Sequence, residues 1–155
     1  MYALGIDGGG SRTRALLCDA YGQIIGQGLS GGTNPRTSSA AELKVHLQEA
    51  IEQATRSIDC SKIITAYFGL AGAGDAETKA KVRTITKELL SEQTTCTIGH
   101  DLEIALAGGL ANNTGIVLVA GTGSACYGRT CDGRSAKCGG WGDLVDDVGS
   151  GSWIG

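Results

Sequence analysis

The stretch GIDGGGSRT, residues 5–13, lies close to the start of the chain, and an apolar run over residues 15–18 follows it. The acidic residue Asp7 ends one apolar run, glycines follow at once, and a second run resumes. Because glycine has no side chain, such a loop lets backbone N–H groups approach a bound anion closely. The stretch therefore predicts two strands joined by an anion-binding loop, with phosphate as the expected anion.

Length and charge limit the class of protein. The chain has 155 residues, enough for one domain with a core, so we expect a single lobe. Its 13 Lys and Arg against 16 Asp and Glu give a net charge of -3 without a basic stripe, so no nucleic acid partner is expected. No apolar run reaches the roughly 18 residues of a membrane span, and no leader precedes the first strand. We therefore expect a cytoplasmic protein without a membrane partner, in which the cysteines are free thiols.

Hydrophobic periodicity predicts an alternation of strands and helices. Strands are expected at residues 2–7, 14–20, 22–29, 63–70, 94–99 and 115–120, the last of them buried. Helices are expected from the capping box at Ser39 to about Ser57, after Asp75 and after Asp101, before a hairpin that turns at residues 132–133. This order predicts an α/β fold with a mixed sheet and helices on its faces.

Glycine-rich loops decide which nucleotide-binding classes remain. A Walker A loop needs a Gly-Lys pair, and the chain has none, which excludes that class. A G-x-G-x-x-G match at residues 26–31 leads into Gly32-Thr33-Asn34-Pro35 where the dinucleotide-binding pattern needs a helix, so we attribute it to chance. A second loop, GTGS at residues 121–124, follows another apolar run. Each loop alone could be a tight turn, but the two together favour a phosphate clamp.

Two carboxylates at strand ends admit two interpretations each. Asp7 is either the first residue of an Asp-Gly turn or a residue that holds Mg²⁺ through water beside nucleotide phosphates. Asp101 is either a helix N-cap or a general base that takes a proton from an attacking hydroxyl. The local sequence leaves both alternatives open.

Six motifs resemble, in their order, those of the BadF/BadG/BcrA/BcrD ATPase family, which includes N-acetylglucosamine kinases. They are IDGGGS (6–11), TNP (33–35), GLAG (69–72), AGTGS (120–124), CGGWG (138–142) and DDVGS (146–150). The family belongs to the sugar kinase, Hsp70 and actin superfamily (ASKHA), and the resemblance covers essentially the whole chain. It implies an RNase H-like lobe of the actin/hexokinase type, with a mixed central sheet flanked by helices.

The resemblance also implies an activity and a site. The activity is transfer of a phosphoryl group from MgATP to an amino sugar of the N-acetylglucosamine or glucosamine class, with O6 as the expected acceptor. Asp101 is implied to be the catalytic base, and Asp7 is implied to assist the metal. ATP phosphates are implied to bind at Gly8, Gly9, Gly10, Ser11, Gly121, Thr122 and Gly123. The sugar is implied to bind at Asn34, Asp101, Ser124, Gly140, Trp141, Gly142 and Asp147.

The chain departs from the family pattern in three places. Ser11 replaces the more usual threonine and keeps the hydroxyl, whereas Val148 stands where a Glu or Gln commonly follows the aspartate. The family pattern also continues into a second lobe that supplies the adenosine pocket. We therefore expect residues 1–155 to be the N-terminal lobe, to have little or no turnover alone, and to be completed by a C-terminal lobe or by a homodimer.

Two other functions remain open at this stage. One is an ATPase activator of a dehydratase or reductase, which would hold a [4Fe–4S] cluster through cysteines such as Cys126 and Cys138 shared across a dimer. Such activators commonly carry Gly-Gln-Asp, where this chain has Gly99-His100-Asp101. The other is a non-catalytic module that senses a sugar or a nucleotide. The sequence does not fix which sugar is bound.

Overall fold

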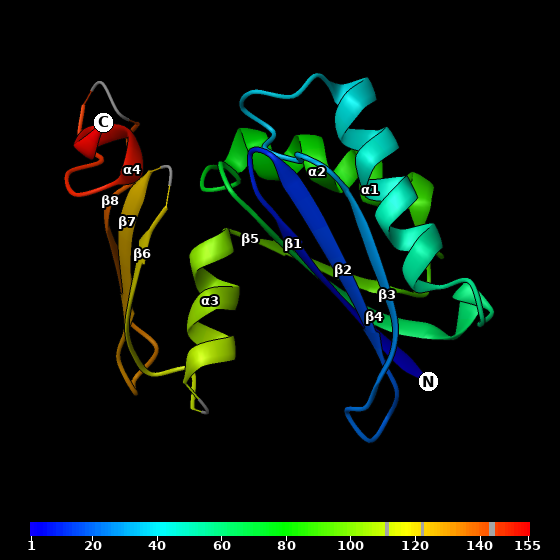
Figure 1. Cartoon of the computed structure of the whole chain (residues 1–155). Helices are drawn as coiled ribbons and strands as arrows, with labels where there is room; N and C mark the ends of the chain where they lie inside the picture. The colour runs from blue at the N-terminus through cyan, green and yellow to red at the C-terminus, as the bar shows by residue number, and fades with distance from the viewer. Residues whose placement is uncertain (111, 122, 143–144) are drawn as a thin grey trace. The chain divides into compact units, whose positions relative to one another are not determined.

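The computed structural model describes residues 1–110, 112–121, 123–142 and 145–155, and Figure 1 shows the course of the chain. The chain divides into two compact units, Met1–Asp101 and Leu102–Gly155. The first unit contains a five-stranded sheet and the second a three-stranded sheet. The assignment of residues 1–155 to the N-terminal lobe of a longer enzyme stays a prediction.

The sheet of the first unit is mixed. Its strands are β1 (Tyr2–Gly8), β2 (Arg12–Cys18), β3 (Ile24–Gly31), β4 (Ile63–Leu70) and β5 (Thr95–Gly99). They lie in the order β3-β2-β1-β4-β5, with β2 antiparallel to both β1 and β3, and with β4 parallel to β1 and β5. The three opening strands that the sequence predicts are thus confirmed, and they form an antiparallel meander. The carboxyl ends of β1, β3, β4 and β5 consequently meet at one edge of the sheet, which we call the carboxyl edge.

The helices of the first unit pack together on one face of its sheet (Figure 1). They are α1 (Ala40–Ala54) and α2 (Ala76–Leu89), with a 3-10 turn η1 (Cys60–Lys62) between them. Ser39 and Glu42 form the predicted capping box, and Asp75 caps α2. The helix α1 ends at Ala54, earlier than predicted. Thr55 is its C-cap, and the hydroxyl of Thr55 donates a hydrogen bond to Ile51 O at 2.8 Å. None of the helices that the structure describes combines the length and the apolar character needed to cross a bilayer.

Apolar side chains from strands and helices form the core of the first unit. Phe68 of β4 is completely buried, and such burial favours folding by about 1.5–3 kcal/mol. Two glycines of β3 explain how closely α1 approaches the sheet, because a Cβ on Gly26 or Gly28 would overlap backbone oxygens of Ala54 or Ala50. The G-x-G-x-x-G match therefore lies within a strand, where its glycines serve helix packing.

The second unit is built on an antiparallel sheet. Its strands are β6 (Gly115–Ala120), β7 (Ser124–Arg129) and β8 (Ser135–Gly139), in that order, followed by α4 (Gly151–Ile154). Helix α3 (Asp101–Gly109) contributes Leu102 and Leu106, which pack with Tyr127 of β7. The predicted hairpin joins β7 to β8, and Gly133 takes the left-handed conformation (φ +84°) that its turn requires.

The prediction that residues 115–120 form a buried strand was wrong in one respect. These residues do form β6, but the side chains of Ile116 and Leu118 are 74% and 71% exposed. Successive side chains of a strand point to opposite faces, and Leu102 and Leu106 pack on the face that carries Tyr127. The other face of β6 is uncovered among the residues that the structure describes.

Candidate functional site

Four segments of the first unit follow strand ends at the carboxyl edge. Residues 9–11 follow β1, residues 32–36 follow β3, residues 71–75 follow β4, and residues 100–101 follow β5. Parallel strands bring their carboxyl ends to the same side of a sheet, which is where open α/β sheets bind ligands. The predicted residues Asp7, Gly8, Gly9, Gly10, Ser11, Asn34 and Asp101 all lie at this edge.

Backbone hydrogen bonds fix the first glycine loop from two sides. Gly9 O accepts the N–H of Thr33 at 2.9 Å, and Gly8 O accepts the N–H of Ala71 at 2.7 Å. Gly8 has no room for a side chain, because a Cβ there would overlap Thr33 Oγ1 and the side chain of Leu70. The loop is thus held by the segments that follow β3 and β4.

The outer part of the same loop is open. Gly10 and Ser11 are exposed, and a Cβ on Gly10 would meet nothing within 4 Å. Within the described ranges, the N–H groups of these two residues donate to no backbone carbonyl. Such N–H groups are suitable donors for an anion.

A buried pair of hydroxyl groups joins β2 to the segment after β3. Thr13 Oγ1 donates to Gly31 O at 2.7 Å and lies 2.8 Å from Thr33 Oγ1. Since Thr13 gives its hydrogen to Gly31, Thr33 is the donor in the second bond. Both threonines are completely buried. They fix the position from which Asn34 leaves the sheet.

Asp7 lies among charged side chains on the face opposite to the core. It alternates with the buried residue Ile6, and together with Gly9, Arg12 and Arg14 it lines a hollow of about 130 Å³. Burial, and then the negative charge of Asp101, raise the pKa of Asp7, while Arg14 and Arg12 oppose the shift. A carboxylate in such surroundings is a reasonable ligand for a divalent cation, which would offset the repulsion from Asp101.

Asp101 is the first residue of α3 and follows β5 after one intervening residue. Asp75 shows how an aspartate caps a helix, since its Oδ1 accepts the N–H of Thr78 at 2.8 Å. Asp101 stands one position further into its helix than Asp75 does, since Asp75 is the N-cap of α2 and Asp101 is the first residue of α3. The N-cap interpretation and the general-base interpretation of Asp101 both stay predictions.

Asn34 is held by its own turn. Its Oδ1 accepts the N–H of Arg36 at 2.9 Å and occupies the space that a Cβ on Gly72 would need. Gly72 is in the left-handed region (φ +81°), which favours glycine independently. Arg36 donates Nε to Gly72 O at 3.2 Å and forms an ion pair with Asp75 at 2.6 Å. The segments after β3 and β4 thus hold each other through Asn34 and Arg36.

The second glycine loop belongs to the second unit and packs against the segment before α4. Gly121 O accepts the N–H of Gly151 at 2.7 Å, and Ser124 Oγ donates to Val148 O at 3.0 Å. Asp147 is only 8% exposed, and its carboxylate would contact a Cβ on Gly123. Thr122, a predicted phosphate ligand, lies outside the described residues.

The remaining predicted sugar ligands form a turn after β8. Gly140 and Gly142 have positive φ values of +74° and +99°, and the side chain of Trp141 between them is 75% exposed. Gly142 O accepts the N–H groups of Val145 and Asp146, each at 3.0 Å. The turn therefore presents a large exposed aromatic ring.

Three residues near the site were not predicted as functional from the sequence. Arg12 and Arg14 line the hollow beside Asp7, and Thr33 carries a buried hydrogen bond. The alternation of Arg12 and Arg14 about Thr13 is a signal that could have placed both arginines on the face of Asp7.

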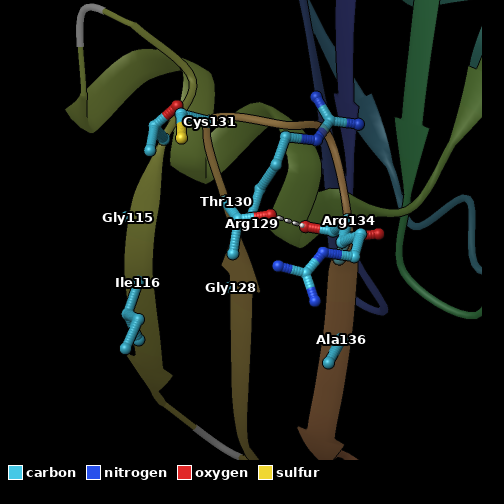
Figure 2. A pocket seen from close by; sticks show the side chains of 10 residues that line it. Gly115, Ile116, Gly128, Arg129, Thr130, Cys131, Arg134 and Ala136 are labelled. Carbon is cyan, nitrogen blue, oxygen red and sulfur yellow. Dashed lines mark hydrogen bonds between the residues drawn. The ribbon is translucent and has the colours of Figure 1, made fainter.

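A larger hollow of about 670 Å³ lies in the second unit, and Figure 2 shows the residues that line it. It is found near the turn that joins β7 to β8, at the opposite end of these strands from Gly121 and Ser124. Thr130 donates its N–H to Arg134 O at 2.9 Å, and its hydroxyl donates to the carboxylate of Asp132. None of the predicted site residues that the structure describes lines this hollow.

The cysteines that kept the cluster alternative open lie in the second unit. Cys126 of β7 is directly opposite Cys138 of β8, and both are free thiols. Among the described residues, no three Cys, His, Asp or Glu side chains are grouped so that they could hold a metal ion. Nothing in the comparisons that follow favours the activator alternative.

The sequence pattern of the BadF/BadG/BcrA/BcrD ATPase family matches residues 4–155. The N-acetylmuramic acid/N-acetylglucosamine kinase of Clostridium acetobutylicum is 38% identical to this chain, over 99% of this chain and 51% of the kinase. The N-acetyl-D-glucosamine kinase of Dictyostelium discoideum is 32% identical, over 98% of this chain and 51% of that kinase. The chain thus spans about half the length of these curated relatives.

A solved structure shows the same fold. The crystal structure of a protein from Chromobacterium violaceum, described as a candidate N-acetylglucosamine kinase, superimposes with a TM-score of 0.80 at 23% identity. The superposition covers 99% of this chain and 53% of that protein. The expected fold class, an α/β fold of the actin and hexokinase type with a mixed sheet flanked by helices, is confirmed.

Proposed function

Because this chain belongs to the BadF/BadG/BcrA/BcrD ATPase family, we propose that it is the N-terminal part of an ATP-dependent amino-sugar kinase. The substrate would be of the N-acetylglucosamine or glucosamine class, the class to which the names of two relatives point. The observation that carries the proposal is the pair of carboxylates, Asp7 and Asp101, whose charges interact beside an open glycine loop at the carboxyl edge.

Asp101 would act as the general base. It would accept the proton of the sugar hydroxyl, with O6 as the expected acceptor, while that oxygen forms a bond to the γ-phosphorus of ATP. The bond from the γ-phosphorus to the bridging oxygen breaks, and the electron pair leaves with ADP. Such a transfer depends mainly on positioning and on charge stabilisation, which fixed carboxylates and backbone N–H groups supply.

Asp7 would hold Mg²⁺, directly or through water. Mg²⁺ commonly keeps several waters and needs only one or two carboxylates, so a single side chain beside the phosphates is sufficient. The raised pKa of Asp7 fits this role, because a nearby cation would favour its charged form. When bound, Mg²⁺ would neutralise part of the charge on the phosphates.

The phosphates would bind to the glycine loops. In the first unit the open N–H groups of Gly10 and Ser11 are the natural donors, with Arg12 close by in the hollow beside Asp7. In the second unit the corresponding ligands would come from Gly121, Thr122 and Gly123.

The sugar would be bound by residues that the local structure already orients. Asn34 keeps its amide Nδ2 group for a ligand, since its Oδ1 is used within the turn. In the second unit, Ser124, Gly140, Trp141, Gly142 and Asp147 are the proposed ligands, and the exposed ring of Trp141 offers a flat surface for a sugar. We place the reaction in the cytoplasm, with the adenosine pocket supplied by a further lobe or by a second copy of the chain.

A substrate panel tests this function. The full-length protein is incubated with MgATP and N-acetylglucosamine, glucosamine, N-acetylmuramic acid or glucose, and the release of ADP and the phosphorylated product are measured. We expect turnover with at least one amino sugar and weaker turnover with glucose. Turnover with no sugar, together with no sugar binding by calorimetry, would contradict the proposal and favour a nucleotide-sensing or activating role.

A further inference from the structure

One lysine of α2 holds the turn that carries Asn34. Lys81 Nζ donates to Pro35 O at 2.9 Å and to Ser38 O at 2.8 Å. The residue is partly buried, and none of the ion pairs between described residues involves its ammonium group. The charge of Lys81 is therefore directed at two backbone carbonyls of this turn.

The turn cannot satisfy these two carbonyls by itself. Its internal hydrogen bonds run to Asn34, whose backbone oxygen accepts the N–H groups of Thr37 at 3.2 Å and Ser38 at 2.9 Å. Asn34 Oδ1 accepts the N–H of Arg36. Without Lys81, Pro35 O and Ser38 O would therefore depend on water, and only the contact of Arg36 with Asp75 would join the turn to the start of α2.

A second contact from the same side is weaker. The ion pair of Arg36 with Asp75 joins side chains that are 60% and 42% exposed, and exposed pairs of this kind contribute little. Hydrogen bonds that involve a charged group are among the stronger ones in proteins, and Lys81 makes two of them in a partly buried setting. Lys81 is thus the main link between α2 and the turn.

We propose that Lys81 is a positioning residue for the sugar, acting through Asn34. Its two hydrogen bonds fix the turn, and the turn fixes the amide group that contacts the sugar. This inference rests on the proposed function. It predicts a selective effect, since the turn around Asn34 is held by Lys81, whereas the first glycine loop is held by Thr33 and Ala71.

The test compares Lys81→Met, Lys81→Arg and the wild type in the full-length protein. Lys81→Met is expected to raise the KM for the amino sugar about tenfold, the size expected for the loss of a charged hydrogen bond, and to change the KM for ATP by less than about twofold. Lys81→Arg keeps several donors and should recover most of the affinity for the sugar. Lys87→Met is the matched control, because Lys87 lies exposed on the same helix.

Amide hydrogen exchange gives a readout that does not need activity. Lys81→Met should accelerate exchange at residues 36–38 and leave β1 unchanged, and Lys87→Met should do neither. If Lys81→Met fails to fold, Lys81→Gln, which keeps one donor group, must show the same selective change at smaller size.

The outcomes separate the two claims. If exchange at residues 36–38 is faster in Lys81→Met but the wild-type protein phosphorylates no amino sugar, the link through Lys81 stands and the proposed function is overturned. An active wild type whose sugar KM is unchanged in Lys81→Met, or whose KM values for sugar and ATP rise together, would overturn the role of Lys81.

Discussion

The carboxylates of Asp7 and Asp101 interact unfavourably at the carboxyl edge of the five-stranded sheet. After burial, the charge of Asp101 is the largest influence that raises the pKa of Asp7, and it outweighs that of Arg14 or of Arg12. Two neighbouring carboxylates that repel each other lower the stability of a folded protein, unless a bound ligand such as a cation offsets the repulsion. The pair is therefore the feature of the first unit that most favours a chemical role over a structural one.

Replacing Asp7 with asparagine should stabilise the protein at neutral pH. The pKa of Asp7 is raised above its ordinary value of 3.8, so the folded state binds the proton more tightly than the unfolded chain does. Stability is therefore lost as the pH rises from about 4 through the folded pKa, and Asp7→Asn removes this loss. The check is urea denaturation from pH 3.5 to 7 with a chelator present.

Asp75→Asn is a comparison variant, because it should destabilise the protein at neutral pH where Asp7→Asn stabilises it. Hydrogen bonds from Thr78 lower the pKa of Asp75, so its carboxylate stabilises the fold above the ordinary pKa and this contribution is lost as the pH falls. If Asp7→Asn were less stable than the wild type at pH 7 under the same conditions, the ionised carboxylate of Asp7 would not be destabilising.

Removing the base should stop the reaction and spare binding. Asp101→Asn in the full-length protein is expected to lower kcat by about 10²–10⁴-fold, the usual contribution of a general base, and to change the affinity for the amino sugar much less. Steady-state kinetics and calorimetry measure the two effects. Asp19→Asn is the matched control, because Asp19 lies in the turn between β2 and β3 at the other end of the sheet. A kcat within threefold of the wild type would exclude Asp101 as the base.

An added methyl group should act differently at two glycines of β1. Gly8→Ala would overlap Thr33 and Leu70 and is expected to lower the free energy of unfolding by about 1–3 kcal/mol. Gly5→Ala lies in the same strand with nothing within 4 Å, and it should leave stability unchanged or raise it by about 0.5 kcal/mol. Thermal or urea unfolding distinguishes the two variants, and equal effects would show that the loop is not tightly packed at Gly8.

Thr13→Val should lower the free energy of unfolding more than Thr33→Val does. Thr13→Val leaves Gly31 O and the hydroxyl of Thr33 without their buried partner, so a cost of about 1–3 kcal/mol is expected. Thr33→Val leaves the bond from Thr13 to Gly31 intact, and about 0.5–1.5 kcal/mol is expected. Urea unfolding of the two variants measures the difference. The reverse order would mean that the direction of the hydrogen bond between the hydroxyls is wrong.

Much of the carboxyl edge could be predicted because the sequence marks strand ends locally. Asp7 and the glycines after it stand where an apolar run stops, and Asp101 follows the run that forms β5. Where strands are parallel, the residues that mark their carboxyl ends in the sequence lie together at one edge of the sheet. The capping box at Ser39 was predictable for the same reason, since both of its partners lie within four residues.

Contacts between distant segments could not be predicted. Lys81 bonds to residues 46 and 43 positions earlier, and nothing in a helix with several lysines distinguishes it from Lys79 or Lys87. The pairing of Asp7 with Arg14 depends on the register of a hairpin, which a shift of one residue would reverse. The exposure of Ile116 was missed because an apolar pattern shows what a strand can bury and not what covers it.

The uncovered strand β6 has a practical consequence for handling these 155 residues. In the described part of the chain β6 pairs on one side only, with β7, and Ile116 and Leu118 are exposed on it. A strand edge with free backbone groups and apolar side chains is a template for pairing with another chain. Preparations of this segment should therefore self-associate as concentration rises, and a lysine in place of Leu118 would keep them in solution.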